Sequence, residues 1–222
     1  HIHEAQFEGK PEDNLVVRAY KLLQERYSLP EIEIHLLKNI PAGAGLGGGS
    51  SDAAFMLKLL NDFFNLGITK DELKDHALSL GSDCPFFIEN KASYVEGRGE
   101  HIFEISDNKL LGKWVILLFP NIHISTQVAF SGIKNYSNPL SKEEFINAAL
   151  SLDNQIKNDF EDALFQKYEL LQELKNSLLE NGARYASLSG SGSVVYGIFN
   201  EEPSLNDFSR ISGVNYYKSQ II

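Results

Sequence analysis

The residues with the clearest chemical potential lie in a glycine-rich segment that precedes a run of small and apolar residues. Five of the seven residues in Gly43–Gly49 are glycine, and Ser50 and Ser51 follow directly. Glycine leaves backbone amides accessible and permits conformations that other residues avoid. Where such a loop leads into a helix, its free N–H groups and the helix dipole together bind anions, typically phosphate. The pattern favours a phosphate-binding loop over the alternative, a flexible turn capped by Ser50 or Ser51.

Two common phosphate-binding motifs, the P-loop and the dinucleotide-binding motif, are the first candidates for this segment. A P-loop requires a lysine followed by serine or threonine at the end of its glycine run, and no lysine lies between Lys38 and Lys58. Gly43–Gly48 does match the dinucleotide-binding pattern G-x-G-x-x-G. However, the preceding segment Glu31–Leu36 alternates polar and apolar residues, whereas strands of a dinucleotide-binding fold are buried on both faces. The P-loop is excluded, and a dinucleotide-binding fold is the weaker alternative.

Periodicity predicts the elements that must position the loop. The alternation of Glu31–Leu36 predicts a strand with one buried face, and His35 falls on the wet face. Capping signals, apolar spacing and helix-ending glycines predict four helices. The first of these helices ends at Tyr27, the second runs from Ser50 to Asn65, and the other two start at the capping boxes Thr69–Glu72 and Ser141–Glu144. A further long helix is expected to carry Leu164, Tyr168, Leu171, Leu174 and Leu178 and to end at Gly182. Strands are expected at Tyr94-Val95, His101–Ile105, Trp114–Phe119, Tyr185–Leu188 and Val194–Phe199.

Composition limits the class of protein. The 222 residues are 43% hydrophobic and 23% charged, which is typical of a globular protein with a substantial core. The net charge of −10 argues against a nucleic-acid partner, because that affinity comes largely from Lys and Arg. Cys84 is the only cysteine and cannot form an internal disulfide, and no apolar run is long enough to span a membrane. We expect a cytoplasmic protein without a membrane partner.

The segment from Pro41 to Ala54 resembles the P-x-G-x-G-L-G-G-G-S-S-x-A-A signature of the GHMP kinases, in the form typical of diphosphocytidyl-methylerythritol kinases. The family's loop wraps the phosphates of ATP. The resemblance therefore implies that the nucleotide is held by Pro41, Ala42, Gly43, Ala44, Gly45, Leu46, Gly47, Gly48, Gly49, Ser50 and Ser51. Asn14 resembles a family asparagine near the adenine, although it is equally suited to cap a helix.

Two later segments are similar to the second and third GHMP motifs, in the same order. Gly81–Phe87 resembles G-A-D-V-P-F-F, which implies that Asp83 is the catalytic acid or base; judged alone, Asp83 is a turn residue before a proline. Leu188–Gly197 resembles the S-G-S-G-S-x-V-F-G turn, which implies that Gly190, Ser191 and Gly192 close the site around nucleotide and acceptor. Judged alone, this segment is a hairpin turn.

The acceptor side of the resemblance rests on Thr126–Phe130. It implies that Thr126 lines a cytidine pocket and that Phe130 stacks on the base, a contact that contributes about 1–3 kcal/mol per base. Without the resemblance, Phe130 would be interpreted as a core residue. No residue of the chain is assigned as a metal ligand.

The resemblance implies an α+β, two-lobe GHMP fold, with a ribosomal protein S5 domain 2-like ATP-binding lobe at 1–115 and a ferredoxin-like lobe at 116–222. It also implies ATP- and Mg²⁺-dependent phosphorylation of the 2-hydroxyl of 4-diphosphocytidyl-2-C-methyl-D-erythritol, in the non-mevalonate route to isoprenoid precursors, by a monomer or homodimer. The family's opening A-K-I-N-L strand and its D-G-Y-H segment do not occur, so we expect an N-terminal segment to be missing. The alternatives are a mevalonate-type, homoserine or sugar kinase, or a catalytically silent nucleotide-binding protein.

Overall fold

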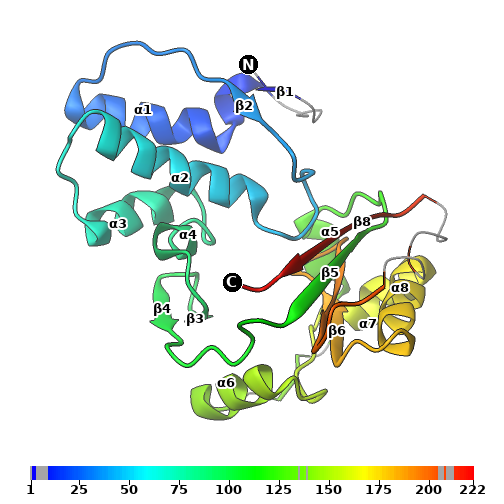
Figure 1. Ribbon diagram of the computed structural model, residues 1–222. Coiled ribbons are helices and arrows are strands. Elements are labelled where there is room, and N and C mark those ends of the chain that lie inside the picture. Colours follow the sequence, from blue (N-terminus) through cyan, green and yellow to red (C-terminus); the bar gives the residue numbers. More distant parts are fainter. Residues whose placement is uncertain (1, 4–9, 135, 139, 205–207, 209–212) are drawn as a thin grey trace. The chain divides into compact units, whose positions relative to one another are not determined.

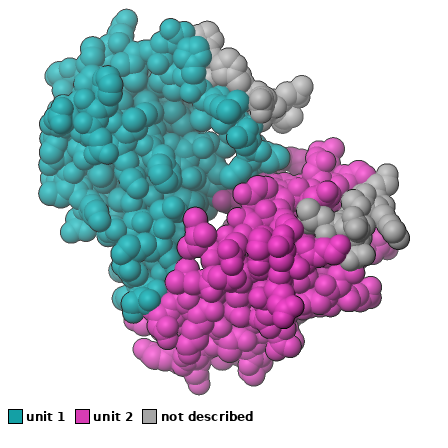
Figure 2. Space-filling view, in the orientation of Figure 1, with its two compact units in different colours: residues 1–42, 47–106 teal, residues 43–46, 107–222 magenta. Residues whose placement is uncertain are grey.

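The computed structural model describes residues 2–3, 10–134, 136–138, 140–204, 208 and 213–222, which fold into two compact units (Figures 1 and 2). Unit 1 contains residues 1–42 and 47–106, and unit 2 contains residues 43–46 and 107–222. The glycine segment is thus divided, with residues 43–46 in unit 2 and the following glycines in unit 1. The assignment of an ATP-binding lobe to 1–115 and a second lobe to 116–222 stays a prediction.

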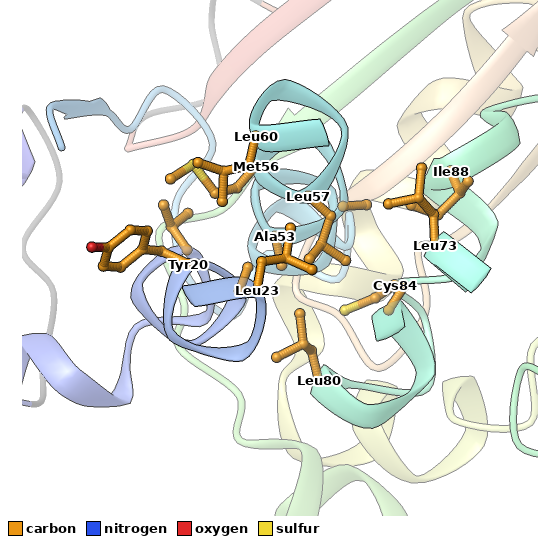
Figure 3. Close-up of a cluster of buried hydrophobic side chains, with 14 of the residues drawn as sticks. Tyr20, Leu23, Ala53, Met56, Leu57, Leu60, Leu73, Leu80, Cys84 and Ile88 are labelled. Carbon is orange, nitrogen blue, oxygen red and sulfur yellow. The ribbon is translucent and has the colours of Figure 1, made fainter. Parts of the chain in front are cut away.

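Unit 1 is built around helices whose apolar faces meet in one cluster of buried side chains (Figure 3). Leu23 and Leu57 are fully buried in this cluster, and full burial of such a side chain contributes about 1.5–3 kcal/mol. The 3-10 turn and helices of unit 1 are η1 (Pro11–Asp13), α1 (Leu15–Tyr27), α2 (Gly48–Phe63), α3 (Lys70–Leu80) and α4 (Phe86–Glu89). The cluster fixes where α2 begins relative to the turn between α3 and α4.

The capping box predicted at the start of α3 is confirmed. The Thr69 hydroxyl accepts from the Glu72 amide at 3.4 Å, and the Glu72 carboxylate accepts from the Thr69 amide at 2.8 Å. The Thr69 hydroxyl also donates to the Glu72 carboxylate at 2.7 Å, and this bond, followed by that from the Thr69 amide, holds the pKa of Glu72 below its usual value. The second predicted box, Ser141 with Glu144, is present in the same form at the start of α6 (Lys142–Ser151).

The strand predicted at Glu31–Leu36 is wrong in extent. Burial does alternate along it, with His35 exposed as expected, but the described strand is only β2 (Leu36–Leu37), paired in parallel with β1 (Ile2–His3). The alternation of polar and apolar residues correctly indicated which face of the segment is buried, but it does not indicate how many of its residues pair with a neighbouring strand. The other strands of unit 1, β3 (Ser93–Glu96) and β4 (His101–Glu104), lie where strands were predicted and pair as an antiparallel hairpin.

Unit 2 contains a four-stranded antiparallel sheet in the order β6-β7-β5-β8 (Figure 1). The strands are β5 (Trp114–Phe119), β6 (Tyr185–Leu188), β7 (Val195–Phe199) and β8 (Asn215–Gln220). Numbered within the unit, this is the order 2-3-1-4 that a ferredoxin-like sheet has. β8 was not predicted, because Asn215–Gln220 has no clear apolar alternation and stays mostly exposed.

The long helix predicted around Leu164 to Leu178 is wrong. The chain forms α7 (Glu161–Lys167) and α8 (Glu169–Glu180), separated at Tyr168, which leaves the helical region with φ −130° and ψ 80°. Leu164 of α7 and Leu174 of α8 nevertheless enter the same core, together with Ile116 of β5. Since both segments keep apolar residues on the buried side and no Pro or Gly marks the break, periodicity alone could not reveal it.

The other helix of unit 2 is α5 (Thr126–Gly132), which follows β5. Within the part of the chain that the structure describes, no helix combines the length and apolarity needed to cross a bilayer.

Candidate active site

The start of α2 offers backbone amides without a side-chain cap. Its N-cap is Gly47, with φ 65°, and this glycine has no side chain that could accept from the first turn. The first helical hydrogen bond runs from the Ser51 amide to the Gly47 carbonyl at 2.8 Å. The amides of Gly48, Gly49 and Ser50 come before that bond, so helix geometry provides them with no acceptor of its own. The helix dipole adds positive potential at the same place.

A lysine missed by the motif analysis lies beside this helix start. Lys38 Nζ is 2.5 Å from the Asp52 carboxylate, and the Lys38 side chain is largely buried. A Cβ added at Gly48 would lie 3.4 Å from the same Nζ. Lys38 follows the alternating segment and precedes Pro41 by three positions, a place that the P-loop pattern does not specify. The start of α2 therefore has a Lys38–Asp52 ion pair beside it that the motifs do not indicate.

The turn that carries Asp83 is attached directly to the start of α2. Cys84 lies in the same buried cluster as Ala53 and Ala54 of α2, and a Cβ added at Gly47 would lie 2.9 Å from the Phe87 ring. Cys84 is fully buried, whereas its neighbour Asp83 is exposed. Consecutive Cα atoms are about 3.8 Å apart, so a fixed Cys84 constrains the Asp83 backbone closely. Two of the three motifs thus meet within unit 1.

Burial raises the pKa of the Cys84 thiol above its usual value. The nearby Asp83 charge adds to this shift, while a hydrogen bond with Ser50 and the Arg18 charge oppose it. Cys84 is therefore a neutral thiol near neutral pH and serves as an anchor, not as a nucleophile. Cys84 stands where the family motif has valine, and it is accommodated as a fully buried side chain.

The β3–β4 hairpin supports the same turn from another side. Gly99 has φ 112°, and a Cβ added there would lie 1.8 Å from the Ser82 carbonyl oxygen. No residue with a side chain fits this approach, which fixes the residue preceding Asp83. The sequence analysis did not find Gly99, because one glycine in a hairpin turn is an ordinary feature until its neighbour is known.

Asn14 caps α1, as the structural alternative predicted. Its Oδ1 accepts from the Val16 amide at 2.9 Å. The following residue, Leu15, approaches the start of α2, since a Cβ added at Gly49 would lie 3.8 Å from its Cδ1. The start of α1 therefore neighbours the start of α2, and a contact between Asn14 and an adenine stays a prediction.

In unit 2, the first half of the glycine segment packs against the third motif. The Ser189 hydroxyl donates to the Gly45 carbonyl at 2.9 Å, and the Val194 amide donates to the Ala44 carbonyl at 3.2 Å. The approach is so close that a Cβ added at Gly45 would lie 2.0 Å from the Ser189 carbonyl oxygen. The predicted hairpin turn is also confirmed, because the Ser189 amide donates to the Val194 carbonyl at 2.8 Å.

The three residues of this turn differ in exposure. Gly190 is exposed, Ser191 is half-buried and Gly192 is buried. A Cβ added at Gly190 would lie 3.0 Å from the Gly45 carbonyl oxygen. The turn therefore supports the loop, and its predicted role in closing the site around ligands is a separate proposal.

The predicted acceptor residues lie on α5 of unit 2. Thr126 is the first residue of the helix, which Ser125 caps by accepting from the Val128 amide at 3.3 Å. Phe130 is 55% exposed, which rejects its interpretation as a core residue. Its ring meets Phe160 edge to face at 5.0 Å between centroids. The Phe160 ring thus limits the orientation of the exposed Phe130 ring.

Comparison with known proteins agrees with both units. The family model for the GHMP kinases N terminal domain matches residues 14–91, and the model for the GHMP kinases C terminal matches residues 140–212. A Bacteroides fragilis protein named 4-diphosphocytidyl-2-C-methyl-D-erythritol kinase is 46% identical over 207 residues, 92% of this chain and 75% of that protein. This chain belongs to the GHMP kinases.

Further GHMP kinases named 4-diphosphocytidyl-2-C-methyl-D-erythritol kinase are similar over comparable lengths. The protein from Bacteroides thetaiotaomicron is 44% identical, over 100% of this chain and 81% of that protein. The protein from Cytophaga hutchinsonii is 43% identical, over 88% of this chain and 73% of that protein. The family membership predicted from the motifs is therefore confirmed by relatives that match most of the chain.

Solved structures confirm the GHMP fold. A crystal structure of 4-(cytidine 5'-diphospho)-2C-methyl-D-erythritol kinase is 27% identical with a TM-score of 0.77, covering 97% of this chain and 81% of that one. A homoserine kinase from Cytophaga hutchinsonii has a TM-score of 0.73 at 16% identity, covering 99% of this chain and 81% of that one, and supports the fold alone.

Replacing Gly45 by alanine is expected to detach the loop from the third motif. The added Cβ would meet the Ser189 carbonyl, so the loop must move and Val194 loses its acceptor, Ala44. Amide exchange at Val194 should then become about tenfold faster, as expected for a lost hydrogen bond. Gly112→Ala is the matched control, because its φ of 81° is similarly strained but nothing lies within 4 Å. Equal exchange at Val194 in both variants would contradict the contact.

Proposed function

We propose that this protein is a kinase that transfers the γ-phosphoryl group of ATP to the 2-hydroxyl of 4-diphosphocytidyl-2-C-methyl-D-erythritol. The observation that carries the proposal is the packing of the Asp83 turn, through Cys84 and Phe87, against the uncapped start of α2. A site for a polyphosphate and a carboxylate for the accepting hydroxyl are thereby parts of one unit. The acceptor is inferred from the names of the relatives, because these proteins match most of the chain at 37–48% identity.

Binding of the nucleotide would rest on backbone amides. The uncapped N–H groups of Gly48, Gly49 and Ser50 donate to phosphate oxygens, and the helix dipole of α2 stabilises the negative charge. Lys38, close to Gly48, forms an ion pair with Asp52, so its charge is balanced within the protein and the backbone amides carry the binding. Because phosphoryl transfer depends mainly on positioning and charge stabilisation, groups fixed before the substrate arrives are effective.

The acceptor hydroxyl would be activated by Asp83. The carboxylate is exposed, so it can reach a substrate hydroxyl, accept its proton and orient the oxygen towards the phosphorus. The backbone around it is held by Cys84 on one side and by Gly99 on the other. The exposed ring of Phe130 would stack on the cytosine, with Thr126 near the same base.

Mg²⁺ fits this donor set as an ion carried by the nucleotide. Among the described residues, no group of three or more His, Cys, Asp or Glu side chains could hold a metal. Mg²⁺ commonly uses one or two protein oxygens together with phosphates and water. The Ser51 hydroxyl at the start of α2 is the oxygen donor that would hold it, and it would neutralise charge on the phosphate oxygens. A cytoplasmic setting, expected from the single cysteine, is part of the same proposal.

The expected outcome for Asp83→Asn in the full-length protein is a fall in turnover of about 10²- to 10⁴-fold with ATP binding retained, because only proton acceptance is lost. Turnover is measured as ADP release with 4-diphosphocytidyl-2-C-methyl-D-erythritol, mevalonate, homoserine and a sugar panel, and binding by calorimetry. Asp62→Asn, exposed near the other end of α2, is the control. Near-normal turnover of Asp83→Asn would remove Asp83 from this role, and wild-type transfer only to another acceptor would replace the proposed substrate.

A further inference from the structure

Four consecutive residues before α7 connect the two halves of the candidate site in unit 2. They are Asn158, Asp159, Phe160 and Glu161, and each makes a different contact with another element of the unit. None belongs to the three motifs that relate the chain to its family. We refer to residues 158–161 as the bracket.

Asn158 holds the third motif by its backbone. Its Nδ2 group donates to the carbonyl of Leu188 at 2.9 Å and to the carbonyl of Gly190 at 2.8 Å. Its Oδ1 accepts from the Phe160 amide at 3.0 Å, which fixes the orientation of the amide group. One side chain thus fastens both ends of the segment from which Ser189 donates to Gly45.

Glu161 fixes the strand that enters the same turn. It is only 2% exposed, and its Oε1 accepts from the Ser187 hydroxyl and from the Leu188 amide, each at 2.9 Å. Lys175 pairs with its other oxygen at 2.6 Å. A buried carboxylate requires such partners, so the position of β6 and the start of α7 are tied together.

The middle of the bracket faces the acceptor side. The Phe160 ring meets Phe130 edge to face, with centroids 5.0 Å apart. Asp159 Oδ1 accepts from the amide of Ser137 at 3.1 Å and also from its hydroxyl. A Cβ added at Gly132 would lie 2.7 Å from Ala163 Cβ, so α5 and α7 are packed as closely as a glycine allows.

We propose that the bracket is a positioning element for the reaction, which holds the Gly43–Leu46 loop through Asn158 and Glu161 and orients the acceptor-stacking ring through Phe160. The proposal rests on the proposed function for its meaning in catalysis. Its residues act through the loop and the ring, and they need not touch either substrate. Asn158 is expected to affect the nucleotide side, and Phe160 the acceptor side.

The first test is Asn158→Asp. Aspartate keeps the oxygen that accepts from Phe160 but loses both donor bonds to the turn. With two hydrogen bonds lost, KM for ATP should rise about tenfold while KM for the acceptor stays within about twofold. Asn181→Asp is the matched control, because Asn181 also donates to a carbonyl, that of Ser177 at 2.8 Å, at the end of α8.

The second test is Phe160→Leu, which keeps an apolar side chain and removes the ring. KM for the acceptor should rise about two- to tenfold while KM for ATP is unchanged, since aromatic pairs contribute modestly beyond their burial. Phe165→Leu on α7 is the control, because Phe165 is half-buried in the same core but does not pair with Phe130. If Phe165→Leu changes the acceptor KM as much as Phe160→Leu, the effect is one of packing and the proposal is wrong.

Amide exchange separates failure of the bracket from failure of the proposed function. In Asn158→Asp, the Val194 and Gly192 amides should exchange about tenfold faster than in wild type, whatever reaction the protein catalyses. Unchanged exchange together with an unchanged KM for ATP would overturn the proposal. Faster exchange in a protein whose wild type transfers no phosphate would leave the bracket in place and contradict the function.

Discussion

A helix must leave its first backbone amides without partners inside the helix, and α2 begins at a residue that offers no side chain to satisfy them. The rest of the candidate site follows from this constraint. Gly47 has φ 65°, and a Cβ there would lie 2.9 Å from the Phe87 ring, so a capping serine or aspartate does not fit this position and the amides stay available to an anion. The helix itself is stable for a different reason, because Ala53, Leu57 and Leu60 anchor it in the core of unit 1. The buried apolar residues of α2 thus stabilise the helix, whereas its first backbone amides are available for binding.

Each compact unit holds its own part of the glycine segment by short-range contacts. In unit 1, Cys84 is buried in one cluster with Ala53 of α2 and Gly47 approaches Phe87, so the Asp83 turn is fastened to the helix start. In unit 2, Ser189 and Val194 donate to the backbone carbonyls of the loop. These supports are mostly backbone or small side chains, which have little conformational freedom to lose. A site fixed in this way suits a reaction that depends on positioning.

Sequence reasoning predicted the parts of the fold whose signals are local. A short residue pattern was enough to predict the capping boxes at Thr69 and Ser141, the hairpin at Ser189 to Val194 and the loop before α2. What it could not predict depends on partners far along the chain. The break at Tyr168 has no breaker residue, β8 has no periodicity, and the short extent of β2 depends on which strand pairs with it.

The same distinction holds for the candidate site. The three motifs could be found because their residue types are unusual together, whereas Lys38, Gly99 and Asn158 are ordinary residues until their neighbours are known. Phe130 was expected to stack on a base only because of the resemblance, since its residue type alone suggests a core position, and more than half of it is exposed. Exposure of a large ring on an ordered helix is information that only the fold supplies.

The most direct test of the account is a crystal structure of the full-length protein with a non-hydrolysable ATP analogue and 4-diphosphocytidyl-2-C-methyl-D-erythritol. The account predicts phosphate oxygens within hydrogen-bonding distance of the amides of Gly48, Gly49 and Ser50, and the accepting hydroxyl beside the Asp83 carboxylate. A triphosphate bound away from the start of α2, or an acceptor hydroxyl remote from Asp83, would contradict it.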